Sequence, residues 1–298
     1  MNQQQTRFQY GGHATFPVRY GWLSKGIDHL ITTGGFTPNT DTADILGLGS
    51  KMVESLAFWL TATGLYVADG DNSHKAATEV AHVVRRHDPY LELPATWWFL
   101  HLSLARREGS VWSWFFNDFS DRIFDRQTCV DAFVQYTRSK AHRPASEQTA
   151  SKDVACLLSA YGVRPGVDVV DPDDVGACPL RELGLIIRHD VVNRFERTRS
   201  PIAIPQEVFL AAASTISAET GKDALSLREI AGLRRGPGRI LCAGLDSISS
   251  LVARAARDRK KYGVHTETLA GELHLRVPRR PLVDWMTDLY ARVDASSS

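Results

Sequence analysis

Apolar residues recur at helical spacing along most of the chain, and glycines interrupt this pattern at defined points. The first clear case lies between Thr42 and Thr63. Asp41–Leu46 predicts a short helix, Gly47-Leu48-Gly49 a tight turn, and Ser50 the N-cap of a second helix. The apolar face of this second helix has a period of three to four residues, through Val53, Leu56, Ala57 and Leu60.

A strand and a turn are expected after these helices. Leu65–Ala68 reads as the strand and Asp69–Asn72 as the turn, which together would form a wing. Two helices, a glycine turn and a wing define a winged helix-turn-helix, and DNA is its natural partner. The side chains expected to face the DNA groove are those of Ser50, Lys51 and Ser55. Winged helices also serve as protein-interaction modules, and the spacing leaves that alternative open.

Residues 73–158 are mainly helical in pattern and hold the densest aromatic segments, Thr96–Leu100 and Val111–Phe116. Such dense clusters in helices predict a buried core rather than a base-stacking surface. A loop rich in Asp, Pro and Gly follows at Val163–Ala177. Its acidic residues lack the glycine and the distal glutamate of an EF-hand, so the loop predicts a solvated turn.

The C-terminal part is expected to contain helices at Gln206–Ser217 and Leu225–Leu233, and a third helix capped by Asp246. A Gly236-Pro237-Gly238 turn precedes this third helix. Cations flank the turn and continue along the helix, which predicts a second DNA-binding patch made of Arg234, Arg235, Arg239, Arg257, Lys260 and Lys261. The alternative is a solvated basic helix face.

The pattern predicts a mainly α fold with minor β structure. An N-terminal winged helix-turn-helix domain is expected at residues 1–72 and a helical core domain at residues 73–165. A C-terminal, mainly helical domain with the basic patch is expected at residues 178–298.

Composition narrows the class of protein. The chain has 298 residues, of which 43% are hydrophobic and 23% charged, as is typical of a folded globular protein. The polar, glutamine-rich start disfavours secretion, and no apolar run is long enough to span a membrane. The four cysteines show no paired spacing and predict buried thiols in a cytoplasmic protein.

The charge distribution does not decide between these functions. The net charge is +1, with 18 basic and 21 acidic residues before Asp190 and 17 basic and 13 acidic residues from there on. A polyanion-binding protein can use a local patch within a neutral total, so the net charge neither supports nor excludes DNA binding.

The most distinctive segment is Gly11–Gly26, which combines His13, two basic residues, three aromatic residues and four glycines. Together with Leu46–Leu60, it resembles the start of the SspB-like family of DNA nicking endonucleases from Ssp-type DNA phosphorothioation systems. The resemblance continues in weaker blocks, in the expected order, at Asp88–Glu92, Phe116–Phe119, Cys178–Leu183 and Gly236–Arg239. Ala14 departs from the family because a glutamate is common at this position, so the position supplies no carboxylate here.

This resemblance implies a protein of bacterial anti-phage defence that nicks one strand of double-stranded DNA. Partner proteins would then exchange a non-bridging phosphate oxygen for sulfur. The partners that it implies are a cysteine desulfurase, an ATPase and an ATP pyrophosphatase-like protein.

Strand cleavage places growing negative charge on the phosphate, and cations or a divalent metal must stabilise it. We expect His13 to act as acid or base, and Arg19 and Lys25 to contact the scissile phosphate. Tyr20 and Trp22 would shape the site. The expected metal is Mg²⁺, although no spaced acidic signature names its ligands. Alternatively, His13 and Arg19 are structural groups that tie the N-terminal segment to the core.

Two other functions remain open from the sequence. A non-catalytic DNA-binding scaffold that recruits the ATPase and the sulfur-transfer partner would also lack a Walker loop and a nuclease motif, as this chain does. A transcriptional regulator would need a clear dimerisation helix, and the pattern shows none.

Overall fold

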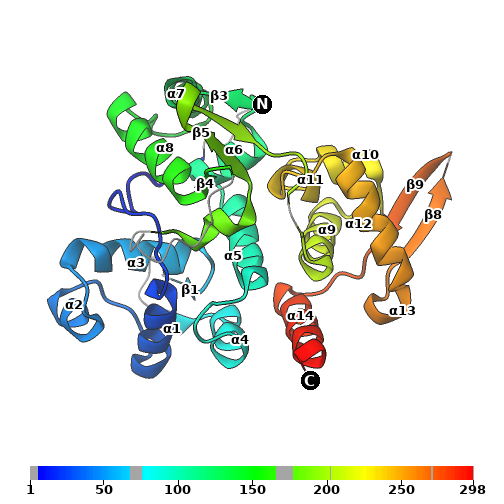
Figure 1. The fold of residues 1–298 in the computed structure, drawn as a ribbon, viewed down its shortest axis with the longest axis horizontal. Coiled ribbons are helices and arrows are strands. Elements are labelled where there is room, and N and C mark those ends of the chain that lie inside the picture. Colours follow the sequence, from blue (N-terminus) through cyan, green and yellow to red (C-terminus); the bar gives the residue numbers. More distant parts are fainter. Residues whose placement is uncertain (1–5, 68–75, 166–176, 202, 270, 298) are drawn as a thin grey trace. The chain divides into compact units, whose positions relative to one another are not determined.

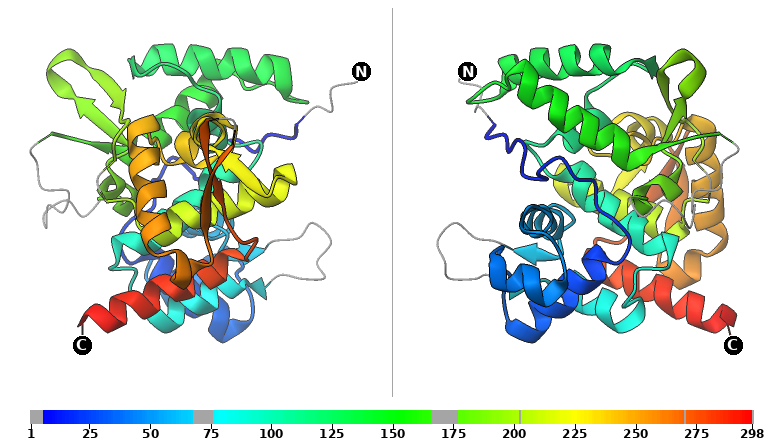
Figure 2. Two further views of the ribbon diagram at one scale, coloured as in Figure 1. Left: turned by 90° about the vertical axis from the view of Figure 1, so that its right-hand side faces the viewer. Right: turned by 60° about the vertical axis from the view of Figure 1, so that its left-hand side comes forward.

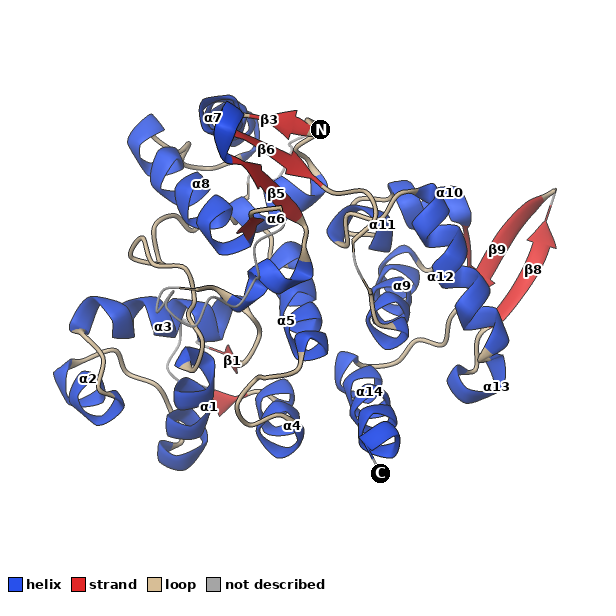
Figure 3. Ribbon diagram, in the orientation of Figure 1, coloured by secondary structure: helices blue, strands red, loops and turns tan. Residues whose placement is uncertain are grey.

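The computed structural model describes residues 6–67, 76–165, 177–201, 203–269 and 271–297. They belong to two compact units, residues 1–197 and residues 198–298, called unit 1 and unit 2 below. Figures 1 and 3 show that each unit is built mainly of helices with small sheets, which confirms the expected mainly α fold with minor β structure.

Unit 1 is a helical assembly with two small sheets. Its helices are α1 (Trp22–Thr33), α2 (Thr40–Leu46), α3 (Ser50–Ala62), α4 (Glu79–His87), α5 (Pro94–Arg106), α6 (Val111–Asn117), α7 (Arg126–Lys140) and α8 (Glu147–Tyr161), with 3₁₀ helices η1 (Pro179–Leu183) and η2 (Asp190–Val192). Its strands are β1 (Tyr66–Val67), β2 (Ala76–Ala77), β3 (Ile123–Phe124), β4 (Gly162–Val163), β5 (Ile186–His189) and β6 (Arg194–Arg197).

Aromatic side chains fill the core of unit 1, as the two aromatic segments predicted. Trp112 of α6 lies against Phe58 and Trp59 of α3, with ring centroids 5.5 and 5.3 Å apart. Trp59 and Trp112 are almost completely buried. These contacts join residues that were expected in two domains, 1–72 and 73–165, into one hydrophobic core.

The end of unit 1 is set by strand pairing. The order of its four-stranded sheet is β3-β6-β5-β4, in which β4 and β5 are parallel and the other pairs antiparallel. Strands β5 and β6 thereby tie residues 186–197 to the helices that precede them. Unit 2 therefore begins at residue 198, twenty residues after the boundary that the sequence led us to expect.

The predicted helix pair near the N-terminus is present as α2 and α3. Gly47 ends α2 with a φ of 63°, a left-handed conformation that favours glycine. Gly49, not Ser50, is the N-cap of α3, and Ser50 is its first residue. Strands β1 and β2 pair antiparallel, but the expected wing turn at residues 69–72 lies outside the described residues. The N-terminal winged helix is therefore not confirmed.

Unit 2 combines helices with a three-stranded sheet. It contains α9 (Gln206–Thr220), β7 (Ala224–Ser226), α10 (Leu227–Gly232), α11 (Pro237–Ile240), α12 (Leu245–Arg257), α13 (Arg259–Tyr262), β8 (His265–Leu269), β9 (Glu272–Arg276) and α14 (Leu282–Ser297). The sheet is antiparallel with the order β7-β9-β8. The predicted helices at 206–217 and 225–233 correspond to α9 and to β7 with α10, whereas Gly244 replaces Asp246 as the N-cap of α12.

A buried carboxylate joins three helices of unit 2. Glu207 of α9 is fully buried and accepts two hydrogen bonds from Arg292 of α14, at 2.8 and 2.9 Å, and one from the Tyr262 hydroxyl at 2.5 Å. Burial acts to raise the pKa of Glu207, but the bonds from Arg292 and Tyr262 outweigh it and hold the pKa below its usual value. The ionised carboxylate therefore stabilises the packing of α9, α13 and α14.

Replacement of Glu207 by glutamine should lower the free energy of unfolding of unit 2 by about 2 kcal/mol, because it removes the charge from the hydrogen bonds of Arg292 and Tyr262, while the partly exposed Arg292 stays solvated. A carboxyl group whose pKa is lowered by folding stabilises the folded state fully at pH values above the pKa that it has in the unfolded chain. This stabilisation is lost as the pH falls through the pKa of the folded state. Thermal unfolding between about pH 7 and pH 3 should therefore be less acid-sensitive in Glu207→Gln than in the natural protein. The control Glu267→Gln, which removes a more exposed ion pair with Arg276, should change stability much less.

Candidate nucleic-acid interface

His13 is part of the core of unit 1. Its side chain is 1% exposed, and Nε2 lies 3.0 Å from Oδ1 of the buried Asp153. The amide of Thr15 donates to Nδ1, so Nε2 carries the proton and donates to Asp153. The rings of Phe58 and Trp112 pack edge-on against the imidazole. In this position His13 ties the N-terminal segment to α8, which is the structural alternative considered from the sequence.

The two cations of the Gly11–Gly26 segment are less buried than His13. The Arg19 guanidinium lies 5.7 Å from the Phe16 ring centre and 5.5 Å from that of Trp22, and its buried Nε has no hydrogen-bond partner among the described residues. Lys25 is exposed, and its Nζ donates to the carbonyl of Leu46 at the end of α2. Because Nε is buried, only the terminal guanidinium nitrogens of Arg19 could meet an incoming phosphate, whereas Lys25 stabilises a helix end.

Tyr20 was expected to shape this site. Its hydroxyl donates to Glu182 of η1, and burial together with this bond raises the pKa of Tyr20. The contact ties the segment to a second part of unit 1.

Helix α3 offers little surface to DNA. Ser55 is fully buried, and its hydroxyl donates to the carbonyl of Phe16 at 3.3 Å. Ser55 therefore cannot reach a groove, which corrects the expectation from helical spacing. Ser50 and Lys51 are exposed, and Lys51 forms an ion pair with Glu54 at 2.8 Å. The buried face of α3 is wider than predicted because both the N-terminal segment and α6 pack on Phe58 and Trp59 of this helix.

Unit 2 has the arrangement that the sequence led us to expect at the N-terminus. Its elements follow one another in the order of a winged helix-turn-helix: helix α9, strand β7, helices α10 and α12, and the β8–β9 hairpin. Strand β9, the third in the chain, lies in the middle of the sheet. A single turn of helix, α11, occupies the connection between α10 and α12. The hairpin and α12 can be followed in the left view of Figure 2. Unit 2 is thus a winged-helix unit with an additional helix, α14.

Close packing at Gly238 fixes the turn between these helices. A Cβ atom at this glycine would lie 2.4 Å from the Ala231 carbonyl oxygen and 2.5 Å from its Cα atom. No side chain fits there without separation of α11 from α10. The glycine of the predicted Gly-Pro-Gly turn therefore serves helix packing.

The predicted basic patch divides into two sets. Arg257 on α12 and Lys260 and Lys261 on α13 are exposed, and the Lys261 ammonium lies 4.9 Å from the Tyr262 ring centre. Helix α12 is strongly amphipathic: it buries its apolar positions and turns its polar ones, which include the exposed Ser249 and Ser250, to solvent. In a winged helix this is the helix that enters the major groove of DNA.

The arginines around the turn are engaged within the chain. Arg235 pairs with Glu219 at 3.1 Å, and Nε of Arg239 donates to the carbonyl of Gly232 at 2.7 Å. Arg234 is exposed. The turn thus contributes less free positive charge than its sequence suggests.

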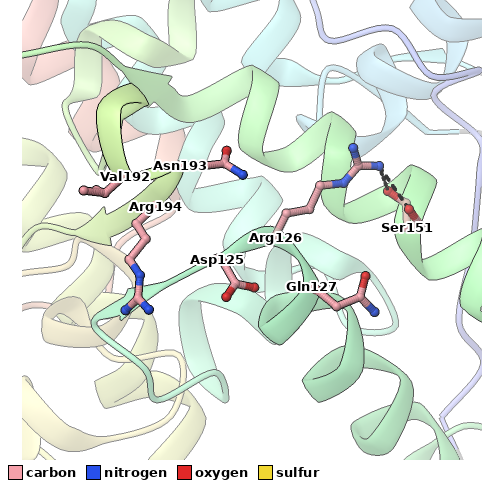
Figure 4. Close-up of a pocket in the computed structure, with 7 residues that line it drawn as sticks. All are labelled: Asp125, Arg126, Gln127, Ser151, Val192, Asn193 and Arg194. Atoms are coloured by element: carbon pink, nitrogen blue, oxygen red, sulfur yellow. Dashed lines mark hydrogen bonds between the residues drawn. The ribbon is translucent and has the colours of Figure 1, made fainter.

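A pocket of about 600 Å³ in unit 1 was not predicted (Figure 4). Polar side chains from α7, α8 and the β5–β6 hairpin line it: Asp125, Arg126, Gln127, Ser151, Asn193 and Arg194, together with Val192. Hydrogen bonds from the backbone and side chain of Thr128 lower the pKa of Asp125. The two halves of the pocket are about 65 residues apart in sequence. The basic character of residues 193–200 was the one feature of the sequence that pointed to a charged surface here.

No metal site emerges near the proposed catalytic residues. Within the part of the chain that the structure describes, no three His, Cys, Asp or Glu side chains are grouped so that they could hold a metal ion. The loop acids Asp171, Asp173 and Asp174 lie outside that part. The described residues around His13 and Arg19 thus do not by themselves provide a metal site.

The cysteines are buried and unpaired, as their spacing in the sequence led us to expect. All four cysteines are free and buried, and burial raises the pKa of Cys129, Cys156 and Cys178. Of the helices described, none combines the length and the apolar character that a membrane crossing requires.

Comparison with known proteins assigns the family. The model of the family described as "Protein of unknown function (DUF4007)" matches residues 10–289, so this chain belongs to the DUF4007 family. A crystal structure of SspB has a similar fold, with a TM-score of 0.83 over 98% of this chain and 90% of that chain, at 22% sequence identity. A magnesium ion-bound crystal structure of SspB matches equally well, at 22% identity over 97% of this chain and 89% of that chain. No curated protein matches the sequence.

Substitution of His13 by alanine should destabilise unit 1 by about 2–4 kcal/mol, because Asp153 would remain buried with only the Gly11 amide as a donor. Thermal unfolding followed by near-ultraviolet circular dichroism, which reports the packing of Trp112, measures the loss. The exposed His142 provides the control, and His142→Ala should melt as the natural protein does. Equal melting of both variants would show that the His13–Asp153 pair contributes nothing to stability.

Proposed function

We propose that this protein binds double-stranded DNA through the winged-helix unit 2 and nicks one strand in support of phosphorothioate modification. The observation that carries the DNA-binding part is the exposed polar face of α12, which continues into the cations of α13. Cations at this position would neutralise backbone phosphates and thereby set the affinity for duplex DNA.

The phosphorothioation part of the proposal rests on the similarity to SspB in sequence blocks and in fold. By the same resemblance, the partners proposed are a cysteine desulfurase, an ATPase and an ATP pyrophosphatase-like protein of one bacterial anti-phage defence system. A Mg²⁺ requirement for nicking is also proposed, because the second SspB structure is described as magnesium ion-bound.

Within the proposed nickase, Arg19 is the best placed of the candidate catalytic residues. Two aromatic rings hold its guanidinium, and its buried Nε lacks a partner among the described residues. Such a group can stabilise the charge that grows on a phosphate during cleavage.

A non-catalytic scaffold is the second candidate function. The burial of His13 behind Phe58 and Trp112 favours it, because a 1% exposed imidazole cannot exchange a proton with a DNA strand at the surface. The scaffold would retain DNA binding by unit 2 and would lack nicking.

Conversion of Arg257, Lys260 and Lys261 to glutamine should weaken duplex binding about 10- to 100-fold at low salt. The slope of log affinity against log salt should fall by about two to three, because each cation releases about one counterion from DNA. Fluorescence anisotropy at several salt concentrations measures both quantities. The charge-matched control Arg138→Gln/Lys140→Gln/Lys152→Gln removes exposed cations from α7 and α8 and should leave the slope unchanged.

Relaxation of supercoiled plasmid distinguishes the nickase from the scaffold. The purified protein should convert supercoiled DNA to open circles with Mg²⁺ and stop when a chelator is added. Arg19→Gln should reduce the rate about 100-fold, because it removes a charge from the proposed phosphate contact. Arg85→Gln, which breaks a surface ion pair with Asp28, serves as the control. DNA binding without any nicking would identify the scaffold instead.

A further inference from the structure

The β5–β6 hairpin presents two adjacent apolar side chains at its tip. Val191 is 101% exposed and Val192 is 62% exposed, in the η2 turn between the strands. Both views of Figure 2 show this yellow-green hairpin standing out from the helices of unit 1. Isolated apolar residues on a surface are ordinary, but a pair at a projecting tip offers a wedge-shaped apolar surface.

Local interactions hold this tip in one conformation. The two strands pair over four residues each, from Ile186 with Arg197 to His189 with Arg194. The Asp190 carboxylate binds Arg164 at 2.7 Å and Arg188 at 2.5 Å, and its carbonyl accepts the Asn193 amide at 3.2 Å. Asn193 closes the turn with a φ of 49°, which asparagine tolerates better than most residues. The tip is therefore preorganised.

Positive charge surrounds the apolar tip. Arg164, Arg188 and Arg194 lie on or beside the hairpin, and Asp190 offsets part of their charge. In duplex nucleic acid, apolar bases are stacked between two chains of phosphates. Apolar side chains flanked by arginines can therefore contact the bases and the phosphates at the same time.

The pocket of Figure 4 lies directly beside this wedge, because Val192, Asn193 and Arg194 form one of its walls. Arg126 forms the opposite side, where the Ser151 carbonyl and hydroxyl hold its guanidinium at 3.1 and 3.0 Å. Asp125 is engaged in capping α7 through the Thr128 amide. Asp125 keeps its negative charge in the pocket, so a bound anion would pair with Arg126 and Arg194 on either side of this carboxylate.

We propose that the hairpin inserts Val191 and Val192 between base pairs of bound DNA, and that the pocket holds a phosphate of the distorted strand between Arg126 and Arg194. Apolar side chains inserted at a base step unstack it and kink the duplex, and cations beside the kink stabilise the displaced phosphate. The inference rests on the proposed DNA binding and adds a DNA-distorting element in unit 1.

A duplex with 2-aminopurine at successive positions tests the wedge, because this base becomes fluorescent when it unstacks. The natural protein should raise its fluorescence about fivefold at one or two neighbouring positions. Val191→Ser/Val192→Ser should abolish the rise while the Kd measured by anisotropy changes less than about threefold. The control Ile45→Ser, at a residue 70% exposed on α2, should keep the rise. Val191→Ser alone repeats the test with a smaller change, and circular dichroism checks that each variant is folded.

The salt dependence of duplex binding tests the proposed phosphate contact in the pocket. Arg194→Gln should lower the slope of log affinity against log salt by about one, and Arg138→Gln should leave it unchanged. Failure of the natural protein to bind duplex DNA would refute the proposed function itself. Binding without any rise in 2-aminopurine fluorescence would overturn the wedge alone, and an unchanged slope in Arg194→Gln would overturn the phosphate contact.

Discussion

The packing of Trp112 against Phe58 and Trp59 is the contact on which the architecture of unit 1 depends. It places α3 and α6 on one hydrophobic core, and His13 packs edge-on against the same indole ring. Large aromatic side chains bury more apolar surface than any others, so such a cluster stabilises the joining of distant segments strongly. The N-terminal region is consequently part of unit 1 and does not form a separate domain.

Burial distinguishes the two helices for which DNA contact is considered. In α3, one of the three positions expected to face a groove, Ser55, is used for packing, whereas Ser50 and Lys51 remain exposed. In unit 2, only one face of α12 is needed for the core, so Ser249, Ser250 and Arg257 remain at the surface. Two helices with similar sequence patterns therefore differ in how much of their surface is covered by the rest of their unit.

The sequence predicted the mainly helical class, the aromatic core and the helices α2, α3 and α9 because these depend on local periodicity. It did not predict that the two N-terminal regions share a core, because the Phe58–Trp112 contact joins residues 54 positions apart. The partners of His13 and Arg235 were equally inaccessible, since Asp153 and Glu219 are brought near only by the fold. The winged-helix arrangement of unit 2 was not predicted, because β7 pairs with β9 about fifty residues further along the chain and alternation alone does not reveal such a pairing.

The buried state of all four cysteines has a practical consequence. Thiolates, not thiols, attack maleimides and other electrophiles. Burial raises the pKa of Cys129, Cys156 and Cys178, and it keeps all four sulfur atoms out of reach. A single cysteine introduced at an exposed position would be the one readily alkylated group among the described residues. Fluorophores or spin labels can thus be attached site-specifically without removal of any native sulfhydryl.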